Sequence, residues 1–368
     1  MKVPMLNLAA QHEGLRDDLV SSATEVMDSH RYINGPQVAE IEQAVAEYSD
    51  CLGAVGVSSG TDALLCAMMT LGISVGDEVI TTPYTFFATA GSIWRTGARP
   101  VFVDIDPVTF NIDPARIEAA INVRTRAVMP VHLFGQMADL DAICDIANCH
   151  GLHVIEDAAQ AIGATQRGRK AGSFGDVGCF SFFPSKNLGG LGDGGMVTAR
   201  DAGLLERLLQ CRNHASNPKY FHSWVGGNFR LDTLQAAALM VKLHYLERWT
   251  AARRSNAALY DTLLAEVDEV TAPVVRPGNG SVFNQYVIRA RRRDALQQRL
   301  TERGIASAIY YPLSLHQQEC FAALGYSKGQ FPHSERAAAR SLALPVYPEL
   351  ASEQIRHVVA AVKGFYAG

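Results

Sequence analysis

The sequence contains no apolar run of the ~18 residues that a membrane-spanning helix needs. Its start, MKVPMLNLAAQHEGLRDDLV, also lacks the charged segment and apolar core of a signal peptide. None of its seven cysteines forms a CxxC pair. Scattered cysteines of odd number in a long chain are typical of reduced thiols rather than of a disulfide framework. We therefore expect a cytoplasmic protein with no membrane partner.

Several motifs that mark common sites are also missing. Neither GxxxxGK[ST] nor a strand–GxGxxG–helix pattern is present, which argues against nucleotide binding by those routes. The absence of HExxH and of clustered histidines predicts no catalytic metal, and there is no GxSxG elbow for a serine hydrolase. VDID at 103–106 resembles a metal-binding DxD, but a strand end turning at Asp106 and Pro107 is the more ordinary interpretation.

Charge excludes a further class of partner. The chain has 33 Lys and Arg against 37 Asp and Glu, a formal net charge of −4. No basic tract is long enough to follow a phosphate backbone. We therefore expect no nucleic-acid partner.

The sequence does contain a regular alternation of strand-like and helix-like segments. Stretches with helical periodicity, such as GTDALLCAMMTLG, separate most of the apolar runs. This spacing predicts an α/β fold with a mainly parallel sheet between helices. The predicted strands are 54–58, 78–82, 100–105, 127–133, 153–157, 177–183 and 195–199.

The pattern changes after about residue 200. Residues 230–266 predict one long helix, straight or bent, because they are rich in Ala and Leu and contain no Gly or Pro. After a boundary loop at 273–281, the chain suggests a small α+β unit with VFNQYVIRA, a helix near 294–303, SAIYY and a helix near 351–363. We predict a large domain over 1–245 and a small C-terminal domain over 246–368, with a linking helix at about 232–266.

A single lysine stands out in CFSFFPSKNLGGLGDGGMV, residues 179–197. Lys186 lies between an apolar strand and a glycine-rich turn, where an ordinary surface lysine would not be expected. A partly desolvated amine of lowered pKa can form a Schiff base with an aldehyde cofactor. Pyridoxal phosphate (PLP) would further need an acid for its ring nitrogen, an aromatic face and a phosphate cradle.

The chain offers a candidate for each of these needs. Asp157 ends the apolar run HVIED and could meet the pyridinium, although it could also simply cap the following helix. SSGTDALL at 58–65 places small polar residues at a strand-to-helix junction, which suits either a phosphate or an ordinary N-cap. Phe86 could stack on the ring or belong to the core. Each feature is ordinary alone, but together they fit one cofactor.

The order of these motifs resembles the DegT/DnrJ/EryC1/StrS aminotransferases, sugar aminotransferases of the aspartate-aminotransferase fold (PLP fold type I). The resemblance covers essentially the whole chain. The blocks EDAAQA and SFFPSKNLGGLGDGG are highly specific to this family. Further matching blocks are VSSGTDAL, DEVITTPYTFFATA, VHLFGQMADLDAI, GGNFRLDTLQAA and YYPLSLHQQ.

The resemblance implies a role for each matching residue. Lys186 would form the internal aldimine with PLP, and Asp157 would face the pyridine nitrogen. Asn228 would reach the phosphate of the neighbouring subunit, which implies a homodimer with shared active sites. The other implied cofactor contacts are Gly60, Thr61, Asp62 and Ser181 at the phosphate, Phe86 on the ring face and Gln160 near the ring hydroxyl; the implied substrate contacts are Arg230, Tyr311 and His316.

The resemblance also implies a reaction. Similar proteins that act as dehydratases or deoxygenases carry histidine at the position of Lys186, so this lysine favours transamination. The implied ping-pong reaction moves an amino group from L-glutamate, through the aminated cofactor, to a keto sugar nucleotide, for an amino sugar of a surface polysaccharide or glycosylated metabolite.

Three alternatives remain at this stage. They are a related PLP-dependent lyase or dehydratase, an aminotransferase for a cyclitol or other non-nucleotide ketone, and a non-catalytic regulatory protein with the same fold. The sugar, its carbon and the nucleotide stay open, since the chain reads Tyr310-Tyr311-Pro312 where the family often reads His-Tyr-Pro.

Overall fold

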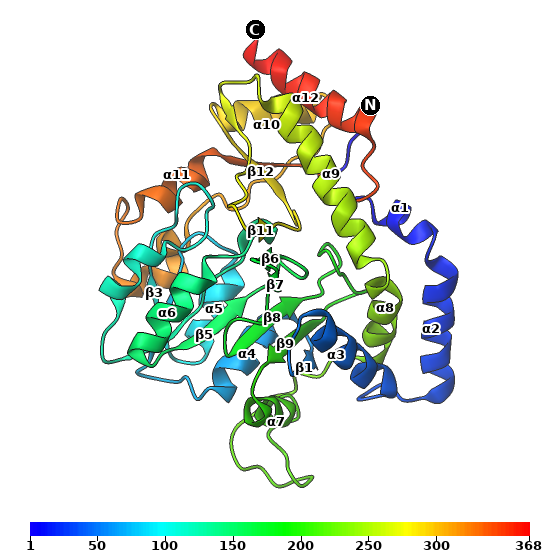
Figure 1. Cartoon of the computed structure of the whole chain (residues 1–368), viewed down its shortest axis with the longest axis vertical. Coiled ribbons are helices and arrows are strands. Elements are labelled where there is room, and N and C mark those ends of the chain that lie inside the picture. The colour runs from blue at the N-terminus through cyan, green and yellow to red at the C-terminus, as the bar shows by residue number, and fades with distance from the viewer.

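A seven-stranded sheet lies at the centre of the computed structural model, which describes residues 1–368 (Figure 1). Its strand order is β1-β9-β8-β5-β4-β2-β3. All of its strands run in one direction except β9, which is antiparallel to both neighbours. The predicted mainly parallel sheet is therefore confirmed. The strands are β1 (Gly53–Val57), β2 (Glu78–Thr81), β3 (Arg99–Phe102), β4 (Thr125–Val128), β5 (His153–Asp157), β8 (Val177–Ser181) and β9 (Gly195–Ala199).

Helices cover both faces of this sheet because successive strand side chains point to opposite sides. In β5, for example, Val154 packs into one core cluster and Ile155 into the other. The first cluster is covered by α3 (Pro36–Tyr48), α6 (Leu140–His150) and α8 (Thr233–Leu243). The second is covered by α4 (Gly60–Thr70), α5 (Phe87–Arg95) and α7 (Ala202–Cys211).

A second, three-stranded antiparallel sheet organises the C-terminal part, in the order β10-β12-β13. Its core cluster takes nearly all its residues from 257 to 362, and Val3 from the N-terminal segment joins it. The elements are β10 (Val270–Thr271), β12 (Tyr286–Ala290), β13 (Ser341–Leu344), α9 (Leu246–Leu264), α10 (Arg293–Glu302), α11 (Pro332–Arg340) and α12 (Ser352–Tyr366).

The remaining elements are short or peripheral. Helix α2 lies beside α8 at one edge of the molecule (Figure 1). These elements are α1 (Leu8–Glu13), α2 (Arg16–Ser29), the small sheet β6 (Thr165–Gln166), β7 (Arg169–Lys170) and β11 (Asn279–Gly280), and 3₁₀ turns at Pro114–Arg116, Glu118–Ala120, Leu133–Gly135, Leu315–Gln317 and Glu319–Leu324.

Three sequence predictions differ from the structure. The long helix is two helices, because α8 packs into the sheet core whereas most of α9 packs into the C-terminal core, and the chain turns at His244 and Tyr245. The strand predicted at 127–133 ends at Val128, before Pro130, which has no N–H to donate to a strand ladder. SAIYY is not a strand, and only Ala308 pairs there, with Ala343.

No helix is both long and apolar enough to cross a membrane. The division of the chain near residue 245 stays a prediction.

Candidate active site

A cavity of about 480 Å³ opens at the carboxyl edge of the central sheet. The ends of β1, β5 and β8 meet there, because Asp157 pairs with Cys179, and Ser181 and Val57 both pair with Gly195. In open α/β sheets this edge is the usual place of ligand sites. The predicted site residues in its lining are Gly60, Thr61, Phe86, Asp157, Gln160, Ser181, Lys186 and Tyr311.

Lys186 enters the cavity from a tight turn after β8. Its backbone N–H donates to Phe183 O at 2.8 Å. A Cβ on Gly189 would lie 2.4 Å from Pro184 O, so the turn that carries the lysine requires glycine at this position. Burial lowers the pKa of Lys186 to about 8, although the nearby charge of Asp157 opposes this shift. About a tenth of the amine is therefore neutral at pH 7, far more than for a free lysine.

Asp157 lies at the end of β5 with a side chain that forms no ion pair. Its Oδ2 accepts from the Thr89 hydroxyl at 2.8 Å and its Oδ1 from the Ala159 N–H at 3.3 Å, and both donors are neutral. The residue is only 4% exposed. Burial raises its pKa, and these hydrogen bonds and the charges of Lys186 and His132 oppose the rise. A cationic ligand atom at this carboxylate would restore its ordinary ionisation.

The first turn of α4 forms the polar end of the cavity. Backbone N–H groups here have no acceptor within the helix. The N-cap Ser59 satisfies one of them, because its Oγ accepts from Asp62 N–H at 3.0 Å. A Cβ on Gly195 would lie 2.4 Å from Ser59 O, so glycine allows β9 to approach the start of this helix. The dipole and free N–H groups of such a turn favour an anion, phosphate included.

Aromatic side chains form another part of the cavity lining. Phe86 is 56% exposed and precedes α5, and its ring lies 6.1 Å from that of Tyr311. The Gln160 side-chain amide donates to the Tyr311 hydroxyl at 3.2 Å, and its Oε1 accepts from Phe134 N–H at 2.7 Å. The core interpretation of Phe86 is therefore wrong, because its ring remains accessible at the cavity.

Four predicted site residues do not line the cavity. Asp62 accepts from the Ser58 hydroxyl at 2.7 Å, which gives it a role in the α4 start. Asn228 is exposed in the segment after α7, and Arg230 pairs with Val57 through the backbone. His316 is buried with its Nε2 3.1 Å from Glu335 Oε1, and its substrate contact stays a prediction.

Sequence reasoning missed the buried support beside Asp157. Glu156 accepts from the N–H groups of Gly172, Phe174 and Gly175 and lies 2.9 Å from His132 Nε2. Burial opposes ionisation of Glu156, but these hydrogen bonds and His132 lower its pKa. The backbone N–H of His132 donates to the backbone carbonyl of Asp157 at 3.0 Å, which ties this network to the end of β5. A buried carboxylate next to Asp157 in HVIED was the available signal.

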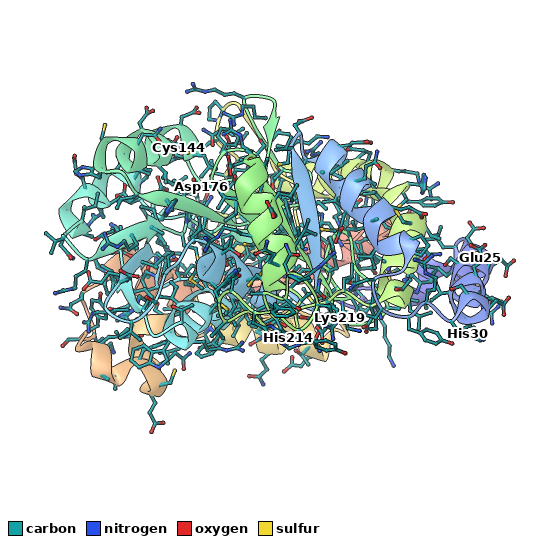
Figure 2. The ribbon with its side chains drawn as sticks, turned by 90° about the horizontal axis from the view of Figure 1, so that it is seen from below. Glu25, His30, Cys144, Asp176, His214 and Lys219 are labelled. Atoms are coloured by element: carbon teal, nitrogen blue, oxygen red, sulfur yellow. The ribbon has the colours of Figure 1, made fainter.

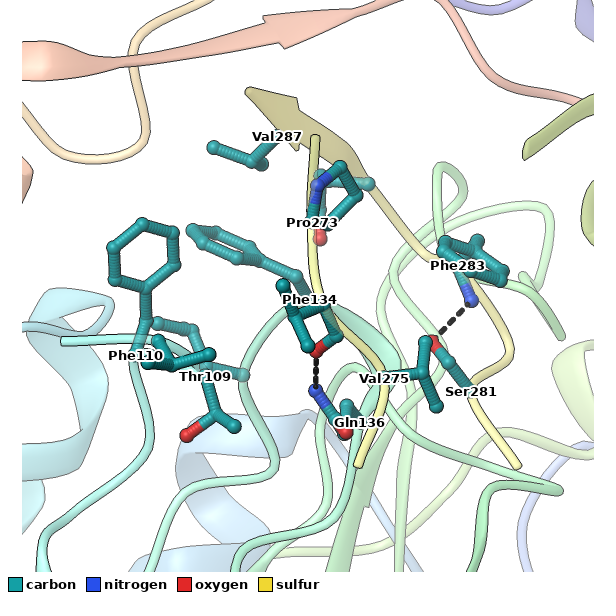
Figure 3. A pocket seen from close by; sticks show the side chains of 13 residues that line it. Thr109, Phe110, Phe134, Gln136, Pro273, Val275, Ser281, Phe283 and Val287 are labelled. Carbon is teal, nitrogen blue, oxygen red and sulfur yellow. Dashed lines mark hydrogen bonds between the residues drawn. The ribbon is translucent and has the colours of Figure 1, made fainter. Parts of the chain in front are cut away.

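A neighbouring cavity, shown in Figure 3, offers no comparable chemistry. It measures about 30 Å³. Phe110, Phe134 and Val287 are among its lining residues, and none of the lining side chains titrates. Two of its polar groups are used within the chain, since Gln136 donates to Val274 O and the Phe283 N–H donates to Ser281 Oγ, whereas Gln285 Oε1 has no hydrogen-bond partner.

Comparison with known proteins agrees with this geometry. A "pleiotropic regulatory protein" of Geobacillus stearothermophilus is 52% identical over 100% of this chain and 99% of its own. A UDP-N-acetyl-3-dehydro-alpha-D-glucosamine 3-aminotransferase of Acidithiobacillus ferrooxidans is 45% identical over 98% of this chain and 97% of its own. The crystal structure of S. venezuelae DesV in complex with a ketimine intermediate superposes with a TM-score of 0.97, at 42% identity, over 99% of this chain and 98% of DesV.

The match to a family model extends over residues 14–363, nearly the whole chain. It includes every residue that lines the cavity at the sheet edge. The chain belongs to the DegT/DnrJ/EryC1/StrS aminotransferase family.

Proposed function

We propose that this aminotransferase uses PLP to move an amino group from L-glutamate to the keto group of a nucleotide-linked sugar. The observation that carries the proposal is the presence of Lys186 and Asp157 in one cavity, the first with a pKa lowered to about 8 and the second with no ion pair. The aminotransferase relative with a UDP-linked sugar in its name supports the substrate class.

The residues around the cavity fit PLP in three respects. Asp157 would serve as the counterion of the ring nitrogen, since its present hydrogen-bond donors are neutral. The first turn of α4, with Gly60 and Thr61, would hold the phosphate, and Phe86 would cover the ring. When bound, PLP supplies an electron sink for negative charge on the carbon that bears the reacting amine.

The chain's own groups would supply positioning and proton transfer. The Nζ of Lys186 would accept a proton from the donor Cα and deliver it to the carbon that had carried the cofactor's aldehyde, a task that needs an amine whose pKa lies near the working pH. Thr89 would hold the Asp157 carboxylate in one orientation through its 2.8 Å hydrogen bond. Tyr311 and Gln160 would form the wall on the substrate side.

A homodimer with shared sites belongs to this proposal. Asn228 does not reach the cavity of its own chain, and the loop after α7 that precedes it projects from the molecule (Figure 1). Figure 2 labels His214 and Lys219 of this loop at the surface. Exposed apolar side chains favour burial against a second copy: Tyr220, Phe221 and Val225 in the loop, Phe86 and Phe183 in the cavity lining, and Phe87 and Leu191 elsewhere on the surface.

The cytoplasm is the proposed location. All seven cysteines are free thiols in the structure. Reduced thiols are typical of the cytoplasm.

A regulatory role is the second candidate, and the printed name of the Geobacillus relative favours it. A regulator with this fold could bind the cofactor or a sugar nucleotide without turnover. The two candidates differ in what glutamate does to the bound cofactor, because only a transaminase converts it to the aminated form.

The decisive experiment loads the protein with PLP and adds L-glutamate. We expect loss of the visible absorbance band, and then mass-detected amination of one member of a panel of keto-sugar nucleotides. Lys186→Ala should bind PLP noncovalently and lose turnover, whereas the exposed Lys328→Ala should behave as wild type. A band that is stable to glutamate would favour the regulatory candidate, and near-normal activity of Lys186→Ala would refute the site assignment.

A further inference from the structure

An arginine-lined cavity lies between the C-terminal sheet and α11. It measures about 340 Å³ and continues into a neighbouring cavity of about 380 Å³, with which it shares Ala290, Arg291 and Arg340. The two share no lining residue with the cavity around Lys186. Five arginines in the lining of these two cavities form no salt bridge: Arg289, Arg291, Arg292, Arg336 and Arg340.

The residues that line the two cavities have a net charge opposite in sign to that of the whole chain. Six arginines line the two cavities, Arg293 included, against the carboxylates of Asp268, Glu269 and Asp294. Asp294 is already paired, with Arg293. The whole chain has a formal net charge of −4. An excess of positive charge gathered in a concave site attracts small anions.

Some of the charged side chains in this lining are held in place by other contacts, but no carboxylate neutralises them. Arg289 donates to Pro107 O at 2.5 Å, and its guanidinium lies 5.6 Å from the centre of the Phe110 ring. Arg336 and Arg340 are four residues apart on α11, so two like charges lie on one face of the helix, which is unfavourable without an anion. One turn earlier, His333 lines the same cavity and its Nδ1 has no hydrogen-bond partner.

We propose that these two cavities bind a phosphorylated, polyhydroxylated small molecule of the sugar-phosphate class. Guanidinium forks match phosphate oxygens in geometry and charge. Asp268, Glu269 and Thr271 supply acceptors for hydroxyl groups in the same lining, and the two carboxylates disfavour a bare polyanion. Phe110 is only 5% exposed, so the site has no open aromatic face for a nucleobase. This proposal does not rest on the transamination proposed above.

Calorimetry on the PLP-loaded enzyme tests the proposal. The probes are α-D-glucose 1-phosphate, inorganic phosphate and glucose. The variants are the double substitution Arg336→Gln with Arg340→Gln, and the control Arg356→Gln, an exposed arginine of α12 outside both cavities. We expect glucose 1-phosphate to bind more tightly than phosphate, glucose not to bind, and the double variant to lose about tenfold or more in affinity, as expected for charged hydrogen bonds. The control should stay within about twofold of wild type.

Hydrogen exchange of the wild-type enzyme locates the bound probe without any substitution. We expect glucose 1-phosphate to slow exchange at 289–294 and 333–340. Slowing only at 181–193, or unchanged affinity in a double variant with a wild-type circular dichroism spectrum, would overturn the proposal. Binding to phosphatidylglycerol vesicles without binding of glucose 1-phosphate would also overturn it, because the phosphate would then belong to a lipid.

Discussion

Asp157 and Lys186 are both driven toward their neutral forms by burial, which raises the pKa of the acid and lowers that of the amine to about 8. Neither shift is useful for stability alone. Both are useful to a cofactor that brings a cationic ring nitrogen to the acid and an aldehyde to the amine. We therefore propose that the two residues act as a pair whose charges are completed by the ligand.

The pH dependence of covalent PLP capture follows from the Lys186 pKa. The neutral amine is the nucleophile, and its fraction rises with pH through the pKa and is complete above it. Capture by the cofactor-free protein should therefore accelerate through about pH 8, the midpoint, and level off roughly one pH unit above it. Stopped-flow absorbance measures this rate. A rate that still rises toward pH 10, as for free lysine, would show an unperturbed amine.

Replacement of Asp157 by Asn removes the negative charge of the side chain but keeps an oxygen that can cap the backbone. An amide oxygen can still accept from Ala159 N–H, so the fold should be kept. Loss of the carboxylate should slow the half-reaction with glutamate by about a hundredfold or more, because one buried charge at the reacting group is removed. Thr89→Val, which removes one neutral hydrogen bond to the same carboxylate, should cost about fivefold. Single-turnover rates of the reaction with glutamate measure both effects. If Asp157→Asn reacts at the wild-type rate, Asp157 serves only as a cap of the backbone.

The buried network that holds Asp157 in place could not be predicted from the sequence. Lys186 could be recognised because a lone amine stands in an apolar and glycine-rich setting. The pairing of Glu156 with His132 could not be recognised, because it joins residues 24 apart and depends on three backbone donors of the 172–175 turn. A sequence shows that a carboxylate is buried but does not show what surrounds it.

The junction of β9 with the start of α4 is the structural element on which the proposed phosphate site depends. At Gly195 a methyl group would meet the backbone of Ser59 and Gly60 at 2.4 to 2.9 Å. Backbone cannot rotate away as a side chain can, so the helix start must shift. The close approach therefore links the geometry of the sheet to that of the anion-binding turn.

Gly195→Ala should lower the free energy of unfolding by about 1–3 kcal/mol and also weaken PLP binding. Denaturant titration and a PLP titration measure the two effects. Gly364→Ala is a matched control in α12, since nothing lies within 4 Å of its added methyl, and it should stabilise by about 0.5–1 kcal/mol. A Gly195→Ala protein with wild-type PLP affinity would show that the α4 start does not hold the phosphate.

The alternation of elements in the central sheet could be predicted because each strand is an apolar run bounded by turn residues. The break between α8 and α9 could not, since residues 230–266 contain no Gly or Pro and the break arises where the two helices pack into different cores. Strand β13 was also missed, because its four buried residues follow α11 without an intervening turn.

The whole molecule raises the question of why Asn228 lies outside its own cavity. The side chain is exposed, and its backbone bridges to Asn213 at the base of the projecting loop. In a twofold dimer, any residue that crosses to the partner is matched by one that returns. A shared site would thus explain both the exposed position of Asn228 and the exposed apolar side chains around it.

Subunit mixing tests this arrangement. Lys186→Ala and Asn228→Asp each disable a site, the second because an added negative charge repels phosphate. If the two residues serve different subunits' sites, a mixed dimer has one site with both defects and one intact site. Random mixing after joint unfolding and refolding makes half of the dimers mixed, so activity should recover to about a quarter of wild type. Wild type refolded in parallel is the control. If mixing restores no activity although wild type refolds, Asn228 serves its own chain and the shared-site model is refuted.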